Sequence, residues 1–106
     1  MDVHFYMTKT GVIPLRVWLE KLKNTSLKVS IFRRLDRLKD GNFGDYKSCG
    51  KGVFELRIDI GPGYRVYYGR KGNEMVLLLA GGTKKSQQKD IETAIKYWND
   101  YLERED

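Results

Sequence analysis

Apolar residues in the first third of the chain recur at the spacing of a helix. Pro14 suits the first turn of a helix, where its missing N–H costs nothing. The stripe that follows has the i, i+3, i+4, i+7 spacing of an amphipathic helix and consists of Leu15, Trp18, Leu19 and Leu22. Asn24-Thr25-Ser26 can cap a second helix before Asp40-Gly41-Asn42. Its apolar face is formed by Leu27, Ile31, Leu35 and Leu38.

After a glycine-rich stretch at 41–52, which is expected to be a loop, the apolar positions change to a strand period. Apolar and charged residues alternate from Phe54 to Ile60, which is typical of a half-buried strand. A turn at 61–63 leads into a second strand, from Tyr64 to Tyr68. The third strand, from Met75 to Ala80, is apolar throughout and is expected to be central, with Gly81-Gly82 as its end.

The flanking segments complete the predicted fold. An extended segment at 2–8 opens the chain, and a last helix is expected after Ser86. Its apolar positions are Ile91, Ala94, Ile95, Trp98 and Leu102. The order β-α-α-β-β-β-α predicts an α+β fold in a single domain, 1–106, with two N-terminal helices packed on a small, mostly antiparallel sheet, and a C-terminal helix.

Net charge is high and unevenly distributed. The 20 Lys and Arg exceed the 14 Asp and Glu, a formal net charge of +6. Residues 1–53 carry all of that excess, with 11 basic and 5 acidic side chains, whereas 54–106 hold 9 of each. The last eight residues have a net charge of −3, so the rest of the chain carries +9. This balance favours a polyanionic partner.

Composition excludes several classes of site. The single cysteine, Cys49, excludes a disulfide framework and a cysteine-based zinc cluster, and the single histidine, His4, leaves little for a His-ligated metal. We therefore expect no metal and no cofactor. The N-terminus lacks the apolar core of a signal peptide, and the longest apolar run, 75–80, is about a third of a membrane span. A cytoplasmic protein without membrane contact is expected.

Alternation along the first two strands selects candidate functional side chains. If Phe54 faces the helices, then Glu55 and Arg57 face solvent, and so do Arg65 and Tyr67 on the next strand. We expect these four side chains on one open sheet face, within cross-strand reach. Spacing alone favours a plainer interpretation, a solvated face with surface ion pairs worth ~0–1 kcal/mol.

Further basic residues point to a phosphate ligand. Lys84 and Lys85 come just after the third strand and before a helix N-terminus, where N–H groups and basic side chains can bind phosphate. Basic residues interleaved with aromatic ones suit RNA, although Tyr64 and Tyr68 are expected at the rim of the core. The second helix carries Arg33, Arg34 and Arg37, which form either a solvated face or a broad electrostatic contact for nucleic acid.

These motifs resemble a known group of toxins. Phe54-Glu55-Leu56-Arg57, followed by Gly63-Tyr64-Arg65-Val66-Tyr67-Tyr68 and by an apolar strand ending in Gly-Gly and Lys84-Lys85, resembles the RelE/ParE superfamily of toxin–antitoxin toxins. The closing stretch 81–91, with Ala94 and Tyr97-Trp98, is similar to the phage-derived, HigB-like branch, often called addiction module killer proteins. The resemblance covers nearly the whole chain and implies a RelE-like fold.

The resemblance also implies a function. It implies the toxin of a type II toxin–antitoxin module, an mRNA endoribonuclease (mRNA interferase) that acts on the ribosome without a metal. A cognate antitoxin, usually a small helix-turn-helix protein, would hold it inactive, and operator DNA would be reached only through that antitoxin. By motif position, Arg65 would hold the scissile phosphate, Arg57 would be a second basic group, and Lys84 or Lys85 would follow the third strand.

Two positions depart from the family pattern. Glu55 stands where some members have a lysine proposed as general base, and the Tyr or His that others carry after the third strand is unmatched. Chemically, Glu55 can act as base or only orient Arg57, and Tyr67 or Lys84 can donate a proton. The expected catalytic residues are Arg65, Arg57, Lys84 and Glu55. The expected RNA contacts are Lys85, Tyr67, Arg70, Arg33 and Arg37.

Two other functions stay open on the sequence. One is a ParE-like protein that inhibits DNA gyrase and cuts nothing. The other is a degenerate, non-catalytic toxin that acts with its antitoxin as an operator-binding module.

Overall fold

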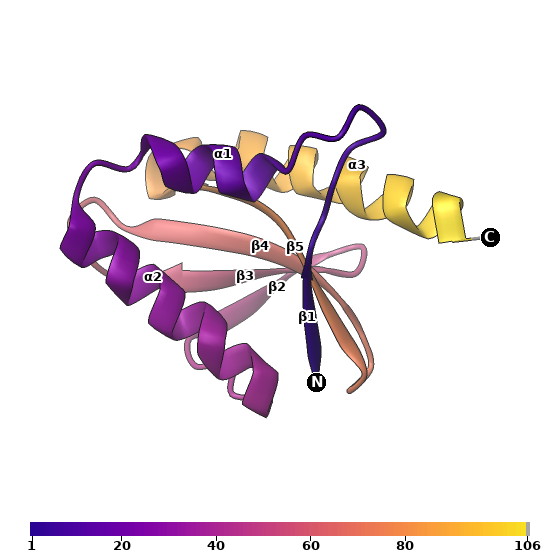
Figure 1. Cartoon of the computed structure of the whole chain (residues 1–106), viewed down its shortest axis with the longest axis horizontal. Coiled ribbons are helices and arrows are strands. Elements are labelled where there is room, and N and C mark those ends of the chain that lie inside the picture. Colours follow the sequence, from indigo (N-terminus) through magenta and orange to yellow (C-terminus); the bar gives the residue numbers. More distant parts are fainter. Residues whose placement is uncertain (106) are drawn as a thin grey trace.

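The computed structural model describes residues 1–105 as an α+β protein, which confirms the predicted class (Figure 1). Its elements are β1 (Asp2–Phe5), α1 (Pro14–Lys21), α2 (Thr25–Arg37), β2 (Tyr46–Gly50), β3 (Val53–Ile58), β4 (Tyr64–Lys71), β5 (Met75–Thr83) and α3 (Gln87–Glu105). Short 3₁₀ turns follow α2 at Leu38–Asp40 and precede α3 at Lys84–Ser86.

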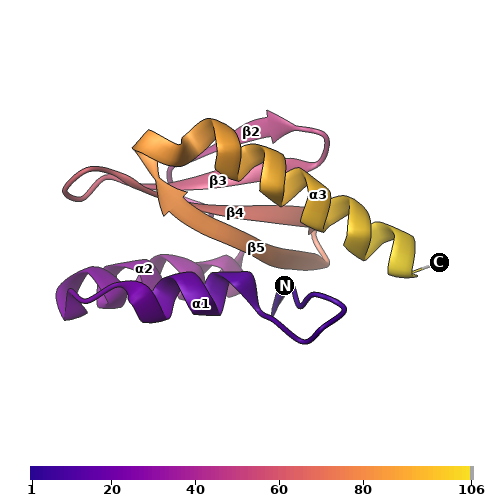
Figure 2. The ribbon, with the colours of Figure 1, turned by 90° about the horizontal axis from the view of Figure 1, so that it is seen from above.

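The strands form one sheet in the order β1-β5-β4-β3-β2. Strand β1 runs parallel to β5, and the other neighbours are antiparallel. Strand β5 therefore has a neighbour on each side, as its apolar composition predicts. Helices α1 and α2 cover one face of the sheet and α3 covers the other (Figure 2).

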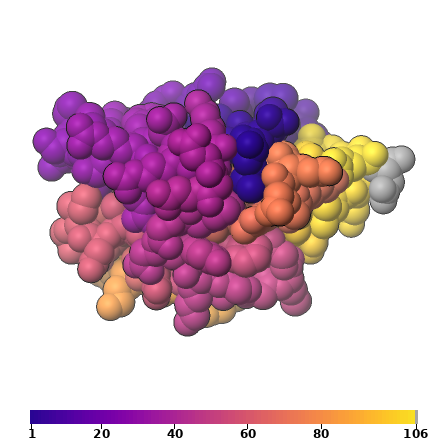
Figure 3. Space-filling model, turned by 90° about the horizontal axis from the view of Figure 1, so that it is seen from below, coloured from indigo at the N-terminus to yellow at the C-terminus, as the bar shows by residue number. Residues whose placement is uncertain are grey.

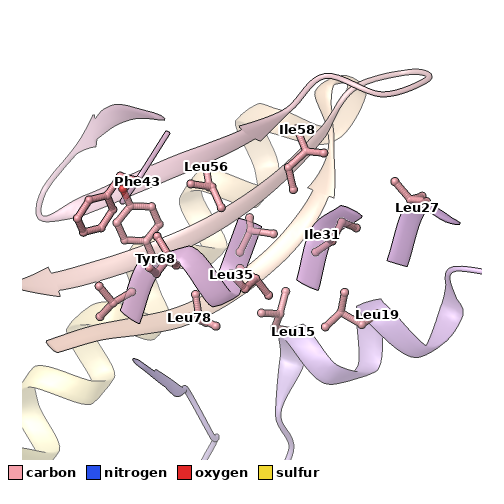
Figure 4. Close-up of a cluster of buried hydrophobic side chains, with 13 residues drawn as sticks. Leu15, Leu19, Leu27, Ile31, Leu35, Phe43, Leu56, Ile58, Tyr68 and Leu78 are labelled. Carbon is pink, nitrogen blue, oxygen red and sulfur yellow. The ribbon is translucent and has the colours of Figure 1, made fainter. Parts of the chain in front are cut away.

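The face toward α1 and α2 has a continuous apolar core (Figure 4). Its buried side chains include Leu15, Leu19, Ile31, Leu35, Leu56, Val66 and Leu78. The predicted cap of α2 is confirmed, because the Asn24 side-chain oxygen accepts a hydrogen bond from the Leu27 N–H at 3.0 Å. Trp18 of α1 packs so closely on Gly81 that a Cβ there would overlap the indole ring.

The face toward α3 has a second apolar core that covers only part of it. Buried side chains here include Tyr6, Val53, Leu77, Leu79, Ala94 and Trp98. Trp98 packs on Gly69 as Trp18 packs on Gly81 across the sheet. The C-terminal part of α3 also anchors the segment after β1, because the Tyr6 hydroxyl donates to Asp100 Oδ2 at 2.5 Å and Arg104 donates to the Met7 carbonyl at 2.7 Å.

Five predicted element bounds are wrong. Strand β4 continues past the predicted Tyr68 to Lys71. The expected loop at 41–52 contains β2, an exposed edge strand with little apolar alternation. Strand β5 continues through Gly81-Gly82 to Thr83. The two glycines do not end the strand; they leave room for Trp18, which packs on Gly81, and for Asp90, which packs on Gly82. Strand β1 ends at Phe5, and β3 ends at Ile58, which leaves Ile60 exposed. Within residues 1–105, no helix is long and apolar enough to span a membrane.

Candidate functional site

Pairing of β3 with β4 brings the predicted side chains together as expected. Glu55 lies opposite Tyr67 in the register, and Arg57 lies opposite Arg65. The face they share is not open, however, because α3 lies across it. Glu55 is 2% exposed and Tyr67 is fully buried in the core under α3. The prediction that both face solvent is wrong, since alternation cannot tell whether a further helix covers the second face.

Glu55 pairs with Arg65 beneath the first turn of α3. Arg65 Nε lies 3.5 Å from Glu55 Oε2, and the two side chains are 11% and 3% exposed. Gln87 Nε2 donates to the same carboxylate oxygen at 2.9 Å. Arg65 Nη1 donates to the Tyr64 carbonyl at 3.2 Å. Glu55 therefore pairs with Arg65 and not with Arg57, the residue that the sequence analysis offered as its partner if Glu55 is not the base.

Arg57 lies on the surface beside a different carboxylate. Its Nε and Nη2 donate to Asp45 Oδ1 at 3.1 and 2.8 Å. Arg34 of α2 supports this arrangement by donating to the Arg57 carbonyl at 2.7 Å and to the Asp45 carbonyl at 3.2 Å. This side chain of the predicted basic helix is thus structural, and burial lowers the pKa of its guanidinium.

The turn before β4 brings Lys84 beside Arg65. The Lys84 N–H donates to the Gly63 carbonyl at 3.0 Å. Gly63 has a φ of 84°, which glycine adopts readily, and a Cβ there would lie 3.5 Å from both Arg65 Nη1 and Lys84 Cβ. Lys84 and Lys85 are exposed, in a 3₁₀ turn held by reciprocal hydrogen bonds between Thr83 and Ser86. The exposed Lys84 therefore lies beside Arg65, but Arg65 is nearly buried, so the prediction that it faces solvent is wrong.

Three polar residues of this site, Ser86, Gln87 and Asp90, were not predicted to belong to it, although Ser86 was expected as a helix cap. Ser86 Oγ donates to Asp90 Oδ2 at 2.5 Å. The Asp90 carboxylate packs on Gly82, and Gly82 is the residue opposite Arg65 in the β4–β5 register. The signal that could have revealed this contact is Gly82 itself, because a glycine inside a strand often marks the close approach of another group.

Burial controls the ionisation of the tyrosines and the cysteine. It raises the pKa of Tyr67 well above its usual value of 10.0, and the negative charges of Glu55 and Asp90 raise it further. The Tyr67 hydroxyl is buried without a hydrogen-bond partner, as is Arg65 Nε. Cys49 lies in β2 rather than in a loop, and burial raises the pKa of its thiol to about 11.

The remaining basic candidates lie outside this cluster. Arg70 is near the far end of β4, where it donates to the Gly72 carbonyl at 2.6 Å and lies 4.3 Å from the centre of the Phe43 ring. Arg33 and Arg37 line a groove with Asp59 beside the end of β3, on the α2 side of the sheet. Tyr68, expected at the rim, is fully buried in the core under α1 and α2.

We call Glu55, Arg65, Lys84, Gln87 and Asp90 the α3 polar cluster. It combines two cationic groups, two carboxylates and an amide at one end of the sheet. Such a set can bind a phosphate and exchange a proton without help from a metal. Within residues 1–105, no group of three His, Cys, Asp or Glu side chains is arranged to hold a metal ion.

Comparison with known proteins places the chain in a family. Residues 17–99 match the family described as "Phage derived protein Gp49-like (DUF891)". The chain belongs to this family. Gp49-like proteins are part of the RelE/HigB-like group of addiction module killer toxins. The chain is also similar to a protein of Haemophilus influenzae described as "Uncharacterized protein", with 54% identity over 77 residues, which cover 73% of the present chain and 78% of the relative.

Proposed function

We propose that this protein is the toxin of a type II toxin–antitoxin module and that it cleaves mRNA on the ribosome without a metal ion. The observation that carries the proposal is the nearly buried Arg65, oriented by Glu55 and bordered by the exposed Lys84 and Lys85. The family is one of addiction module toxins, which supports a toxic activity. The net charge of +6 favours the polyanionic ribosome as its place of action.

The proposed reaction uses the RNA's own 2′-hydroxyl. The 2′ oxygen attacks the adjacent phosphorus, the bond from phosphorus to the 5′ oxygen breaks, and the products are a 2′,3′-cyclic phosphate and a 5′-hydroxyl. A base accepts the 2′ proton and an acid supplies a proton to the leaving 5′ oxygen, so the proton balance closes. Arg65 stabilises the charge that develops on the non-bridging phosphate oxygens.

The α3 polar cluster supplies candidates for the other roles. We assign Asp90 as the base, because its carboxylate is only half-buried and lies beside the strand position of Arg65. Lys84 is the proton donor and a second cation. Glu55 is a positioning residue that acts through Arg65, since its carboxylate is already engaged by Arg65 and Gln87. Arg57 contributes less, because its pairing with Asp45 must open before it binds RNA.

The test is induced expression of variants, with mRNA cleavage mapped by primer extension on translated and untranslated messages. We expect the wild-type chain to arrest growth and to cut only translated messages. Arg65→Gln and Asp90→Asn should each lower cleavage by about 10²–10³-fold. Lys96→Ala, which removes an exposed lysine of α3 away from the cluster, is the control and should cleave like the wild type. Full cleavage by Arg65→Gln with an intact fold would refute the assignment.

A gyrase inhibitor is the second candidate, and one observation favours it. Glu55 and Tyr67, two of the four side chains expected on an open face, are buried, which leaves fewer accessible acid–base groups. A ParE-like activity would induce the DNA-damage response with no mRNA cleavage. A degenerate toxin would cause no growth arrest at all. The same expression experiment therefore separates the three functions.

A further inference from the structure

Two arginines of the sheet are each paired with a carboxylate, and the two pairs differ in exposure. The side chains of Arg65 and Glu55 are 11% and 3% exposed. Those of Arg57 and Asp45 are 37% and 54% exposed. Arg57 and Arg65 are register partners on neighbouring strands, which run about 5 Å apart, and both alternate onto the face toward α3. One arginine is therefore held in a nearly buried pair, and its neighbour in a pair that a ligand can reach.

The segment that carries Asp45 is held firmly in place. Arg34 of α2 donates to the Asp45 carbonyl at 3.2 Å and to the Phe43 carbonyl at 3.4 Å. Gly44 between them has a φ of 59°, and a Cβ there would lie 3.0 Å from Arg34 Nη2. The Arg57 N–H also donates to the Asp45 carbonyl, at 2.9 Å. The chain that joins α2 to β2 (magenta) lies at the surface beside α2 in Figure 3, so Asp45 is an exposed carboxylate at a fixed position.

The Asp45 carboxylate takes the place at Arg57 that a phosphate oxygen would take. Its Oδ1 accepts hydrogen bonds from both Nε and Nη2 of Arg57 and so engages one edge of the guanidinium. Carboxylate and phosphate oxygens bind arginine through the same paired N–H groups. An RNA phosphate therefore reaches this edge of Arg57 only by displacing the carboxylate. Because exposed ion pairs are weak, that exchange is possible.

The exchange favours one kind of anion over another. A free anion gains little from it, since one ion pair is broken for each one formed. A phosphate of an RNA chain that is already bound at Arg65 gains more, because the chain holds it near Arg57 at a high effective concentration. The pair of Arg57 and Asp45 therefore discriminates against single anions and in favour of a chain with neighbouring phosphates.

We propose that Asp45 is a specificity-determining residue of the RNA site. Its carboxylate keeps Arg57 from binding single anions, and it is displaced by the phosphate next to the one that Arg65 holds. The ligand class is thus an RNA chain with adjacent phosphates. The inference rests on the proposed function in one respect, namely that Arg65 holds the scissile phosphate.

The first test measures affinity for RNA by fluorescence anisotropy. The probe is a short single-stranded RNA with 2′-O-methyl groups, which cannot be cleaved through its 2′ oxygens. Asp45→Asn keeps the shape of the side chain and removes its charge, and it should tighten binding about two- to fivefold. Asp36→Asn is the matched control, because Asp36 is an exposed carboxylate that pairs with Lys39 at 3.5 Å. It makes the same change of charge and should bind within about 1.5-fold of the wild type, since salt screens distant charges.

A double-mutant cycle tests whether Asp45 acts through Arg57. Arg57→Gln should weaken RNA binding by less than about twofold in the wild type, where the carboxylate must first be displaced. In Asp45→Asn the same change should weaken it about two- to fivefold. There it should also lower the slope of log affinity against log salt by about 0.7, the value for one phosphate contact of a single strand.

The third test uses NMR to follow the Nε–H resonances of two arginines. Added RNA should move the resonance of Arg57 and leave that of Arg34, a side chain bound to backbone carbonyls, unchanged. Inorganic phosphate is the single anion. It should leave Arg57 unchanged in the wild type and move its resonance in Asp45→Asn, because only there is the edge of the guanidinium free.

Several results would overturn this role of Asp45. They are weaker RNA binding in Asp45→Asn, which would mean that the carboxylate only orients Arg57, equal changes in Asp45→Asn and Asp36→Asn, and additive effects in the cycle. An Arg57 resonance that RNA does not move, or no RNA binding by the wild type, would also overturn it. Cleavage is scored separately. A chain with the expected affinities that cuts no message would refute the proposed function and leave the role of Asp45 in binding intact.

Discussion

The two faces of the sheet differ in what they bury. Under α1 and α2 the buried side chains are apolar or aromatic from one end to the other. Under α3 they are apolar around Trp98 but polar near the first turn of the helix, where Glu55 lies nearly buried. Both faces hold a tryptophan against a glycine, Trp18 on Gly81 and Trp98 on Gly69, so the apolar parts are built alike.

The polar part under α3 has an energetic consequence. A buried carboxylate loses its hydration, and an ion pair recovers that free energy only in part. Well-packed apolar residues would stabilise this end of the sheet at least as well. The arrangement of Glu55, Arg65 and Gln87 is therefore better explained by function than by folding. The α1/α2 face, in contrast, is apolar throughout, so we expect substitutions there to change stability and not activity.

The largest expected effect is on the α1/α2 face. Leu56 is fully buried there, so Leu56→Ala should lower the free energy of unfolding by about 2–5 kcal/mol, measured by urea denaturation. Val17→Ala, at a position that is 40% exposed on α1, should change it by no more than about 0.5 kcal/mol. The folded fraction of Leu56→Ala should cleave mRNA at the wild-type rate. A lower rate per folded molecule would show that this face also contributes to activity.

The next largest effect is expected for Arg65 on the α3 face, where a double variant can separate the loss of stability from the loss of activity. Arg65→Gln leaves the Glu55 carboxylate buried without its cation, so it should lower the free energy of unfolding by about 3 kcal/mol. Glu55→Gln removes the charge and can keep its hydrogen bond with Gln87. The double variant should regain most of the lost stability while cleavage stays about 10²–10³-fold down. Cleavage regained together with stability would mean that Arg65 acts only on the fold.

The comparison of the two faces also shows how far sequence reasoning reaches. Both helices of the first face were predicted, because a single apolar stripe defines each; α1 is Pro14–Lys21 and α2 is Thr25–Arg37, and the predicted end of the second helix at Asp40 is a 3₁₀ turn, Leu38–Asp40. Strand β2 was missed, since an exposed edge strand needs no apolar alternation. The continuation of β5 through Gly81-Gly82 was missed because the reason for those glycines, the contacts of Trp18 and Asp90, comes from other elements.

The candidate site was also predicted only in part, because contacts between different elements decide which side chains meet. Strand alternation was sufficient to place Glu55, Arg57, Arg65 and Tyr67 on one face within cross-strand reach, whereas their register comes from the structure. The partner of Glu55 was not predictable, because it depends on which side chains reach across the sheet and on Gln87 of a helix more than 30 positions away in the chain. A local pattern describes one face of one element, whereas the polar cluster needs β3, β4, β5 and α3 together.

The smallest expected effect is that of removing the hydroxyl group of Tyr67 or of Tyr68, which are neighbours in β4 on opposite faces of the sheet. Both are fully buried with hydroxyls that have no hydrogen-bond partner. Tyr67→Phe and Tyr68→Phe should each leave the free energy of unfolding unchanged or raise it by up to about 1 kcal/mol at neutral pH. Cleavage should stay within about twofold of the wild type in both. A fall in Tyr67→Phe alone would mean that its buried hydroxyl takes part in the reaction.

Alkaline pH sharpens this last comparison. Burial raises the pKa of both tyrosines in the folded chain above 10.0, the value expected after unfolding. A pKa raised by folding gives stability that is complete below about pH 10 and is lost as the pH rises above it, because only the unfolded chain releases the proton. Urea titrations at pH 8 and pH 11 should therefore show a smaller loss of stability in each Tyr→Phe variant than in the wild type. An equal loss in all three would mean that these hydroxyls ionise in the folded protein, so that neither face excludes water from its tyrosine.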